Sequence, residues 1–398
     1  MKTIIRTRSF TLMLCVVLLL LTPLSSIQAE NSTVTTHARA AALIDVESGR
    51  ILYSSRGDEP MLIASLTKIM TAIVAIENGD LASKVKVGKN AFAKEGSSIY
   101  LKQGEEMTLE NMLYGLMLRS GNDAATAIAE HIGGSEEGFV YMMNTKAEEL
   151  GLRNTHFANP HGLDAEGHYS SANDLAVLTA YALHNPVFKE IVKTEERTAD
   201  NPYEKWDYKW RNKNKMLYLY EGADGVKTGY TKKALRCLVS SATRNGQQLV
   251  AVTINDGDDW NDHANLLNFG FNHFPLKTLI ERGDPVSGYN FVASRTFAYP
   301  LGQGEQNRVI TKLVLNQKQE TSPNTRDNFG LQGALILELG GKEIGRVPVY
   351  SPENLPPEQS LYHKKYEPTQ AEAYPAGNWL QALGSALRAL FELGAGIK

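Results

Sequence analysis

Cysteine is almost absent from this 398-residue chain, which contains only Cys15 and Cys237. We expect the segment with Cys15 to be removed, and a chain left with one cysteine cannot form an internal disulfide. An excess of positive charge is also missing, because 41 Lys and Arg stand against 44 Asp and Glu and the net charge is −3. This balance argues against a nucleic-acid partner. Cys237 is expected to be a small core residue.

Long apolar runs are confined to the N-terminus. Basic residues precede the run Thr11–Leu21, and Ile27–Ala29 provides the small residue that signal cleavage needs. The run is too short to span a bilayer, so residues 1–29 are predicted to be a secretory signal peptide. An uncleaved membrane anchor is the alternative.

Helix and strand patterns alternate over residues 30–276. Ala40–Ile44 and Arg50–Ser54 predict a hairpin, and Ile63–Ile76 predicts a helix that is apolar nearly all round and therefore buried. Cys237–Ala242 and Leu249–Ile254 predict strands joined at Asn245-Gly246. Helices flanking an antiparallel sheet indicate an α/β (α+β) domain.

The pattern changes at about residue 277. Strand-like runs alternate with turns over 277–351, which indicates a small all-β domain. Residues 352–377 are rich in proline and polar residues, which is typical of a linker. Apolar residues then recur at three- and four-residue steps over 378–398, which predicts an amphipathic helix too polar to span a bilayer but suited to its surface. Docking of this helix on the β domain is the alternative.

Ser65-Leu66-Thr67-Lys68 places a hydroxyl and an amine one helical turn apart. Serine needs a neighbouring base to become a nucleophile, and lysine can be that base only when burial lowers its pKa. The spacing is a weak signal, because Ser83-Lys84-Val85-Lys86 also has it and because a helix cap and a surface amine would explain it equally well. Only Ser65, however, opens a buried helix.

Two further motifs follow in order. Ser120-Gly121-Asn122 lies between two predicted helices, the second of which Asp123 is expected to cap, and could relay a proton and hold a substrate amide. Lys227-Thr228-Gly229, which occurs once in the chain, begins a predicted strand and offers a positive charge for a carboxylate. S-x-x-K, S-x-N and K-T-G together are the signature of penicillin-binding proteins and class A β-lactamases.

With these motifs, the chain resembles the low-molecular-mass D-alanyl-D-alanine carboxypeptidases, the penicillin-binding proteins of the S11 serine peptidase family. The stretches that carry the resemblance are Ile63–Thr71, Leu118–Ala124, Asn159–Leu163 and Asp224–Thr231. It covers essentially the whole mature chain and is less specific after about Pro275. Thr253–Asp256 and Trp260–His263 look most like the sporulation-type members.

The resemblance implies removal of the terminal D-alanine from peptidoglycan stem peptides in cell-wall maturation. It further implies acylation by β-lactams, no cofactor or metal, and a location at the outer face of the bacterial cytoplasmic membrane or in the cell wall or periplasmic space. The implied catalytic residues are Ser65, Lys68 and Ser120, and the implied substrate-binding residues are Asn122, Lys227, Thr228, Gly229, Tyr230 and His161. Backbone N–H groups of Ser65 and Tyr230 would form the oxyanion hole.

Two departures from the family pattern concern the carboxylate site. Leu235 and Arg236 stand where members often have glycine and an aromatic residue, and no arginine lies in 256–263. Carboxylate binding is therefore expected to depend on Lys227, or on Arg236 if it points inward. Three histidines, His156, His161 and His168, lie close in sequence, but their spacing matches no standard zinc pattern.

Two other functions fit part of this pattern. A class A-like β-lactamase would need a deacylating glutamate in an E-x-x-N pattern, and none occurs between Ser120 and Lys227. A non-catalytic sensor of peptidoglycan or β-lactams could dispense with Lys68 or Ser120, whereas this chain has both. The complete set favours a carboxypeptidase.

Overall fold

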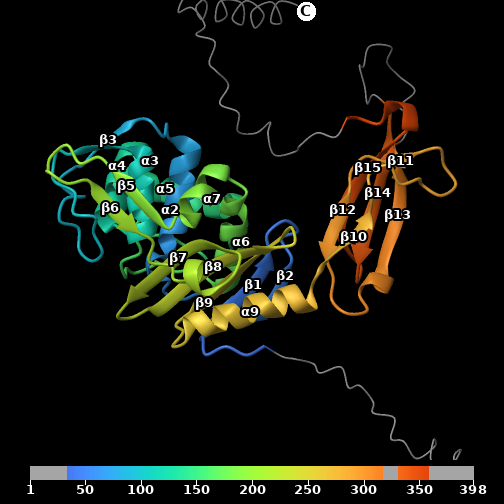
Figure 1. Ribbon diagram of the computed structural model, residues 1–398, viewed down its shortest axis with the longest axis horizontal. Coiled ribbons are helices and arrows are strands. Elements are labelled where there is room, and N and C mark those ends of the chain that lie inside the picture. The colour runs from blue at the N-terminus through green and yellow to red at the C-terminus, as the bar shows by residue number, and fades with distance from the viewer. Residues whose placement is uncertain (1–33, 317–329, 358–398) are drawn as a thin grey trace, which may run out of the picture. The chain divides into compact units, whose positions relative to one another are not determined.

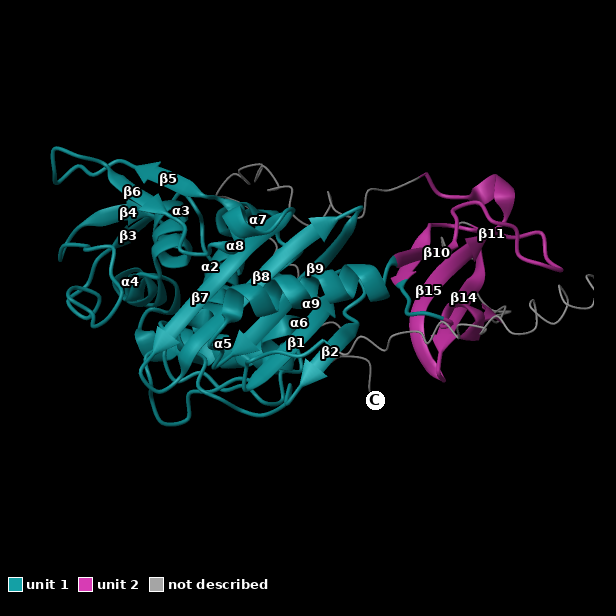
Figure 2. Ribbon diagram, turned by 60° about the horizontal axis from the view of Figure 1, so that its bottom comes forward, with its two compact units in different colours: residues 1–275, 300–303 teal, residues 276–299, 304–398 magenta. Residues whose placement is uncertain are grey.

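The computed structural model describes residues 34–316 and 330–357. The described part of the chain divides into two compact units. One ends at Pro275 and is rejoined by Pro300–Gln303, and the other is formed by Leu276–Tyr299 and the described residues from Gly304 onward (Figure 2). The sequence-based boundary lies one residue further along, and the return of Pro300–Gln303 to the first unit had no sequence signal. The predicted signal peptide, most of the predicted linker and the predicted terminal helix lie outside the described residues.

A five-stranded antiparallel sheet, in the order β2-β1-β9-β8-β7, forms the centre of the first unit (Figure 1). Its strands are β1 (Ala40–Asp45), β2 (Ile51–Ser55), β7 (Ala223–Thr231), β8 (Leu235–Arg244) and β9 (Gln247–Ile254). The predicted N-terminal hairpin and the β8–β9 hairpin are confirmed. Every residue of β1 is buried, because both faces of the sheet are covered.

The two faces of the sheet belong to two different apolar clusters. Alternate β1 residues such as Ala42 and Ile44 join the larger cluster, and Ala41 and Leu43 join the smaller one with α9 (Asp259–His273). The period of two along a strand sends successive side chains to opposite faces, which explains this division. The first unit is therefore a layered α/β domain, with α9 lying along the sheet in Figure 2.

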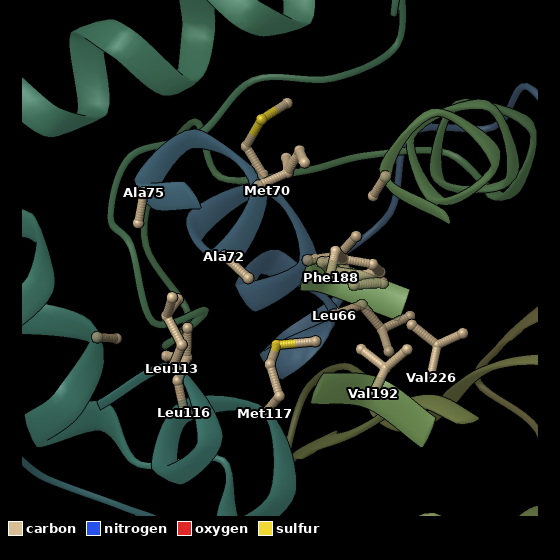
Figure 3. Close-up of a cluster of buried hydrophobic side chains, with 14 of the residues drawn as sticks. Leu66, Met70, Ala72, Ala75, Leu113, Leu116, Met117, Phe188, Val192 and Val226 are labelled. Atoms are coloured by element: carbon tan, nitrogen blue, oxygen red, sulfur yellow. The ribbon is translucent and has the colours of Figure 1, made fainter. Parts of the chain in front are cut away.

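The larger cluster contains the buried helix that the sequence predicted. That helix begins as a 3₁₀ turn, η1 (Ala64–Thr67), and continues as α2 (Lys68–Asn78). The helices around it are α3 (Leu109–Tyr114), the π-helical turn η2 (Gly115–Arg119), α4 (Asn122–Gly133), α5 (Glu136–Glu149), α6 (Ala172–Leu183) and α7 (Pro186–Lys193). Side chains of η1, α2, α3, η2, α7 and β7 meet in Figure 3, including Leu66, Met70, Leu113, Met117, Phe188 and Val226. Burial of Ala64, Leu66 and Thr67 fixes the position of η1, and therefore of Ser65 between them.

Helix capping partly follows the sequence. Thr108, of a residue type favoured at this position, is the N-cap of α3 and accepts a hydrogen bond from the amide of Asn111 at 3.3 Å. The prediction that Asp123 caps α4 is wrong, because Gly121 occupies the N-cap position. The Asp123 carboxylate instead accepts hydrogen bonds from the backbone of Ile99 and Leu101, both at 3.1 Å. This carboxylate ties the loop at 99–101 to the start of α4.

Shorter elements complete the first unit. They are the hairpins β3 (Lys84–Lys86) with β4 (Glu106–Thr108) and β5 (Glu196–Ala199) with β6 (Tyr208–Arg211), and the helix α8 (Met216–Leu219). None of the helices in the described part of the chain has the length and apolarity needed to cross a membrane.

The second unit is built from strands, as the sequence predicted. Its four-stranded antiparallel sheet has the order β11-β15-β14-β13, and a second sheet pairs β10 with β12. The strands are β10 (Leu276–Ile280), β11 (Val292–Ala293), β12 (Phe297–Pro300), β13 (Val309–Leu315), β14 (Leu331–Leu339) and β15 (Lys342–Tyr350). A small core that includes Ile280, Leu337 and Val347 holds them together. Its described residues form no α-helix, only the 3₁₀ turns η3 (Gln306–Arg308) and η4 (Pro352–Asn354).

Candidate active site

The 3₁₀ turn η1 presents Ser65 beside the buried α2. Ala64, immediately before it, has φ +48°, a left-handed conformation that a residue with a Cβ rarely adopts. Such a conformation costs on the order of 1–3 kcal/mol and persists only where the surroundings impose it. Leu66 and Thr67 are buried, whereas Ser65 is partly exposed. The strained turn therefore exposes one hydroxyl at the edge of the core.

Lys68 lies one turn after Ser65 and is fully buried. Its Nζ is 3.1 Å from Ser65 Oγ and donates hydrogen bonds to Asn122 Oδ1, at 2.7 Å, and to the carbonyl oxygen of His161. Burial lowers the pKa of Lys68 well below its usual value, and the positive charges of Lys227 and Lys213 add to this effect. A neutral amine has two N–H donors and one lone pair. With both donors directed at carbonyl oxygens, the lone pair faces the Ser65 hydroxyl.

The Asn159–Leu163 loop packs directly on η1 and α2. Thr71 Oγ1 donates to the Pro160 carbonyl at 2.6 Å. Gly162 has φ +86°, and a Cβ there would lie 2.0 Å from the carbonyl oxygen of Ala64, so only glycine fits. The loop thereby brings the His161 carbonyl to Lys68.

The side chain of His161, which the resemblance places among the substrate-binding residues, is buried. Its Nδ1 accepts from the Leu163 amide at 3.2 Å, and its Nε2 lies 3.5 Å from Glu136 Oε1. Burial and the surrounding polar contacts hold the ring inside the domain. The direct contribution of this residue to the site is its backbone carbonyl, which sequence reasoning did not single out.

Ser120 and Asn122 approach from the junction between η2 and α4. Ser120 has φ +67° and is buried at the point where the π-helical turn ends. Asn122 accepts from Lys68, and its amide Nδ2 donates to the Glu95 carbonyl at 2.6 Å. An Asn side chain has one further N–H and one further lone pair. Asn122 therefore orients Lys68 and retains capacity for a substrate amide.

Strand β7 brings Lys227, Thr228 and Gly229 beside η1. A Cβ on Gly229 would lie 3.1 Å from the amide nitrogen of Ser65, so the strand passes very close to the nucleophile. Lys227 is 1% exposed, and its Nζ donates to the Thr228 carbonyl at 2.8 Å. Burial, assisted by the charge of Lys213, lowers the pKa of Lys227 to about 7. The Tyr230 side chain is exposed, which leaves its backbone as the part that the predicted oxyanion hole would use.

Lys213 is a residue of the site that sequence reasoning missed. Its backbone amide donates to the Leu118 carbonyl at 3.2 Å, and its Nζ lies 3.4 Å from Ser97 Oγ. The residue is exposed, and partial desolvation together with the charge of Arg119 lowers the pKa of Lys213 itself. In the sequence it lies among other basic and polar residues, so no local pattern distinguished it from a solvated lysine.

Arg236 is held in an ion pair with Asp259. Its Nε donates to Asp259 Oδ2 at 3.1 Å, and NH2 bonds the other carboxylate oxygen. A bidentate pair of this kind occupies the planar edge of the guanidinium. Lys227 is therefore the better-placed cation for a carboxylate. Cys237, next in sequence, is buried as predicted, and burial raises its pKa to about 12.

The three clustered histidines take separate structural roles. His168 Nδ1 accepts from the Ala158 amide at 3.0 Å, while its Nε2 contacts Thr67 Oγ1 at 2.8 Å. His156 Nδ1 is 2.6 Å from the Gly167 carbonyl. Within the described ranges, no group of three or more His, Cys, Asp or Glu side chains could hold a metal ion.

These residues form one constellation suited to acyl transfer. The Ser65 hydroxyl faces the buried amine of Lys68, whose pKa is lowered. Ser120 stands two residues before Asn122, which accepts a hydrogen bond from this amine. The buried Lys227 lies on strand β7. Such a set provides a nucleophile, its base and electrostatic stabilisation of an anionic substrate.

Comparisons with known proteins agree with this geometry. Residues 26–258 match the family model described as D-alanyl-D-alanine carboxypeptidase, of the S11 peptidases. The chain is 35% identical over 336 residues to the D-alanyl-D-alanine carboxypeptidase DacF of Bacillus subtilis, covering 80% of this chain and 86% of the relative. DacC of Escherichia coli, another D-alanyl-D-alanine carboxypeptidase, is 32% identical over 344 residues, which cover 80% of this chain and 84% of DacC.

A solved structure gives the same result. Penicillin binding protein 5 from Haemophilus influenzae is similar with a TM-score of 0.64 and 28% identity, over 79% of this chain and 96% of that one. The likeness therefore extends over nearly the whole of that protein and is one of fold as well as of sequence.

Proposed function

Because the chain belongs to the S11 peptidase family of D-alanyl-D-alanine carboxypeptidases, we propose that it removes the terminal D-alanine from peptidoglycan stem peptides through an acyl-enzyme on Ser65. The observation that carries this proposal is the 3.1 Å contact between Ser65 Oγ and a buried Lys68 whose other two partners are carbonyl oxygens. That arrangement leaves the lone pair of a neutral amine facing the hydroxyl.

The reaction follows from the positions of these groups. Lys68 takes the Ser65 proton as Oγ attacks the carbonyl carbon between the two D-alanines, and the backbone N–H groups of Ser65 and Tyr230 stabilise the oxyanion. Ser120 passes a proton to the leaving amine, and D-alanine departs. Water then hydrolyses the ester and restores the Ser65 hydroxyl. Lys227 and Thr228 bind the terminal carboxylate, Gly229 lets the substrate approach the strand, and Asn122 holds the substrate amide.

β-Lactams resemble this substrate in our proposal and acylate the same Ser65. Neither alternative function is favoured. A non-catalytic sensor could dispense with Lys68 or Ser120, and this chain has both. The relatives found by comparison include D-alanyl-D-alanine carboxypeptidases, a penicillin-binding protein and a DD-transpeptidase.

Export and membrane association are part of the same proposal. The N-terminal 29 residues have the pattern of a signal peptide, and 378–398 that of an interfacial helix. We place the enzyme at the outer face of the cytoplasmic membrane or in the cell wall or periplasmic space, where its substrate is made and remodelled. A sporulation-specific role stays a prediction.

Replacement of the nucleophile tests the proposed reaction. Ser65→Ala should abolish both covalent labelling by a fluorescent penicillin and release of D-alanine from a small D-Ala-D-Ala peptide, because no other hydroxyl faces Lys68 Nζ in the described residues. Ser83→Ala is the matched control, since Ser83 belongs to the other S-x-x-K sequence and its hydroxyl donates to the Asp80 carbonyl. Labelling that survives Ser65→Ala would contradict the assignment. A single burst of D-alanine from the wild-type protein, without turnover, would favour the sensor.

A further inference from the structure

A half-buried carboxylate stands behind the general base and takes no part in the reaction as proposed. Glu136 is the first residue of α5, and its Oε2 accepts from Lys94 Nζ at 3.1 Å. Its other oxygen, Oε1, faces His161 Nε2 at 3.5 Å. These contacts hold the pKa of Glu136 at about 2, so the group is an anion at neutral pH.

The tautomer of His161 follows from its contacts. Nδ1 accepts the Leu163 N–H at 3.2 Å, so a neutral ring carries its proton on Nε2, pointing to Glu136. A second proton on Nδ1 would face the Leu163 N–H, donor against donor. Burial and the charges of Lys68 and Lys94 also lower the pKa of His161. The His161 ring is therefore neutral as long as Nδ1 accepts the Leu163 N–H.

The same residue orients Lys68 through its backbone. The His161 carbonyl accepts a hydrogen bond from Lys68 Nζ, and the two neighbouring amides, of His161 and Gly162, donate to Asn159 Oδ1 at 3.3 and 2.7 Å. The ring is joined to the same turn through the Leu163 amide, at 3.2 Å from Nδ1, so a ring that moved would break this bond and loosen the turn that holds the carbonyl. The His161 Nε2 is buried and has no hydrogen bond of ordinary geometry. The Glu136 carboxylate, 3.5 Å away, is therefore the group that offsets the cost of burying this N–H.

We propose that Glu136, paired with Lys94, is a positioning residue for the general base. By facing the His161 Nε2–H, it fixes the ring and therefore the carbonyl that directs the lone pair of Lys68 at Ser65. The inference rests on the role of Lys68 in the proposed function. Glu136 touches neither substrate nor reacting atoms, so it acts on the covalent step and not on binding.

The test uses a fluorescent penicillin as probe and measures the covalent step and the binding step separately. Glu136→Ala should lower the first-order acylation rate about tenfold or more, since a displacement of about 1 Å at a reacting group can cost a hundredfold. The dissociation constant of the complex before acylation should not change. Glu136→Gln keeps one acceptor oxygen and should recover part of the rate, whether or not Glu136→Ala folds well.

Glu77→Ala is the matched control. Glu77 lies on α2, the helix that carries Lys68, and joins α2 to α5 through Lys146 at 3.0 Å, as another ion pair with a mostly buried carboxylate. The Glu77→Ala substitution should lower the melting temperature at least as much as Glu136→Ala does, but it should leave the acylation rate unchanged. Equal acylation losses in the Glu136 and Glu77 variants, or a loss confined to binding, would overturn the inference. Absence of acylation in the wild-type protein would instead overturn the proposed function.

Discussion

At the scale of single residues, the site depends on lysines that the fold keeps from water. Lys68 and Lys227 are both buried, and burial lowers the pKa of each because it penalises the charged form. The two tasks need opposite charge states. In the proposed mechanism, Lys68 acts when neutral, whereas Lys227 binds a carboxylate only when protonated.

This difference predicts how substrate preference depends on pH. Lys227 has a pKa of about 7 in the free enzyme, so it is charged below that pH and neutral above it. The ratio of kcat/KM for a peptide with a free C-terminus to that for the same peptide amidated should be highest below pH 7 and fall as pH rises through it. Deprotonation of Lys68 affects both peptides alike and cancels in the ratio.

Lys227→Gln supplies the control for this profile. A lost charge-assisted hydrogen bond costs about 1.5–3 kcal/mol, so turnover of the free peptide should fall roughly ten- to a hundredfold more than that of the amide. In this variant the ratio should no longer depend on pH. Equal losses on both peptides would remove Lys227 from the carboxylate site.

At the scale of elements, the Asn159–Leu163 loop decides whether Lys68 is oriented. The loop is closed by its own Asn159 side chain, whose Nδ2 donates to the Leu163 carbonyl at 2.9 Å, and it lies on η1 at Gly162. The strained turn at Ala64 is thus held from outside by an element about a hundred residues further along the chain.

Two glycines of neighbouring turns test this role. Gly162→Ala would place a Cβ 2.0 Å from the Ala64 carbonyl, so it should displace the loop and lower acylation by roughly tenfold or more. Gly167→Ala carries the same backbone strain, with φ +73°, but its Cβ would meet no atom closer than 3.7 Å. Both variants lose about 1–2 kcal/mol to the left-handed conformation. The rate of acylation by a fluorescent penicillin should therefore fall only in Gly162→Ala, and equal rates in the two variants would show that the loop does not orient the base.

At the scale of the whole molecule, the chain combines the catalytic unit with a strand-built unit and with a C-terminal sequence of amphipathic character. Apolar residues of that sequence, Trp379, Leu380, Leu383, Leu387, Leu390 and Phe391, recur at helical spacing. A helix of this kind binds the bilayer surface through its apolar face. Tethering would keep the catalytic unit near nascent cell wall.

Deletion from Asn378 onward should release the protein. The truncated enzyme is expected in the soluble fraction rather than the membrane fraction, because the apolar face is the proposed anchor. Its activity on a small soluble peptide should be unchanged, since none of the described catalytic groups lies in the deleted segment. Retention in the membrane fraction after signal cleavage, or loss of folding, would favour docking of this segment on the β domain.

The sequence by itself determined the chemical groups and most of the framework. The three motifs predicted Ser65, Lys68, Ser120 and Lys227 as functional residues, because a nucleophile and its base at fixed local spacing leave a recognisable pattern. Apolar periodicity predicted the buried helix and the hairpins, since local backbone geometry dictates which residues share a face. These are short-range properties of the chain.

Only the tertiary structure decided how those groups are tuned. Lys213, Glu136 and the carbonyl of His161 reach the site from loops and helix ends distant in sequence, and a backbone carbonyl has no residue identity to recognise. The pairing of Arg236 with Asp259 and the capture of Asp123 by the loop at 98–101 likewise depend on where separate segments meet. Burial and charge proximity set pKa values and hydrogen-bond partners, and both are properties of the folded chain alone.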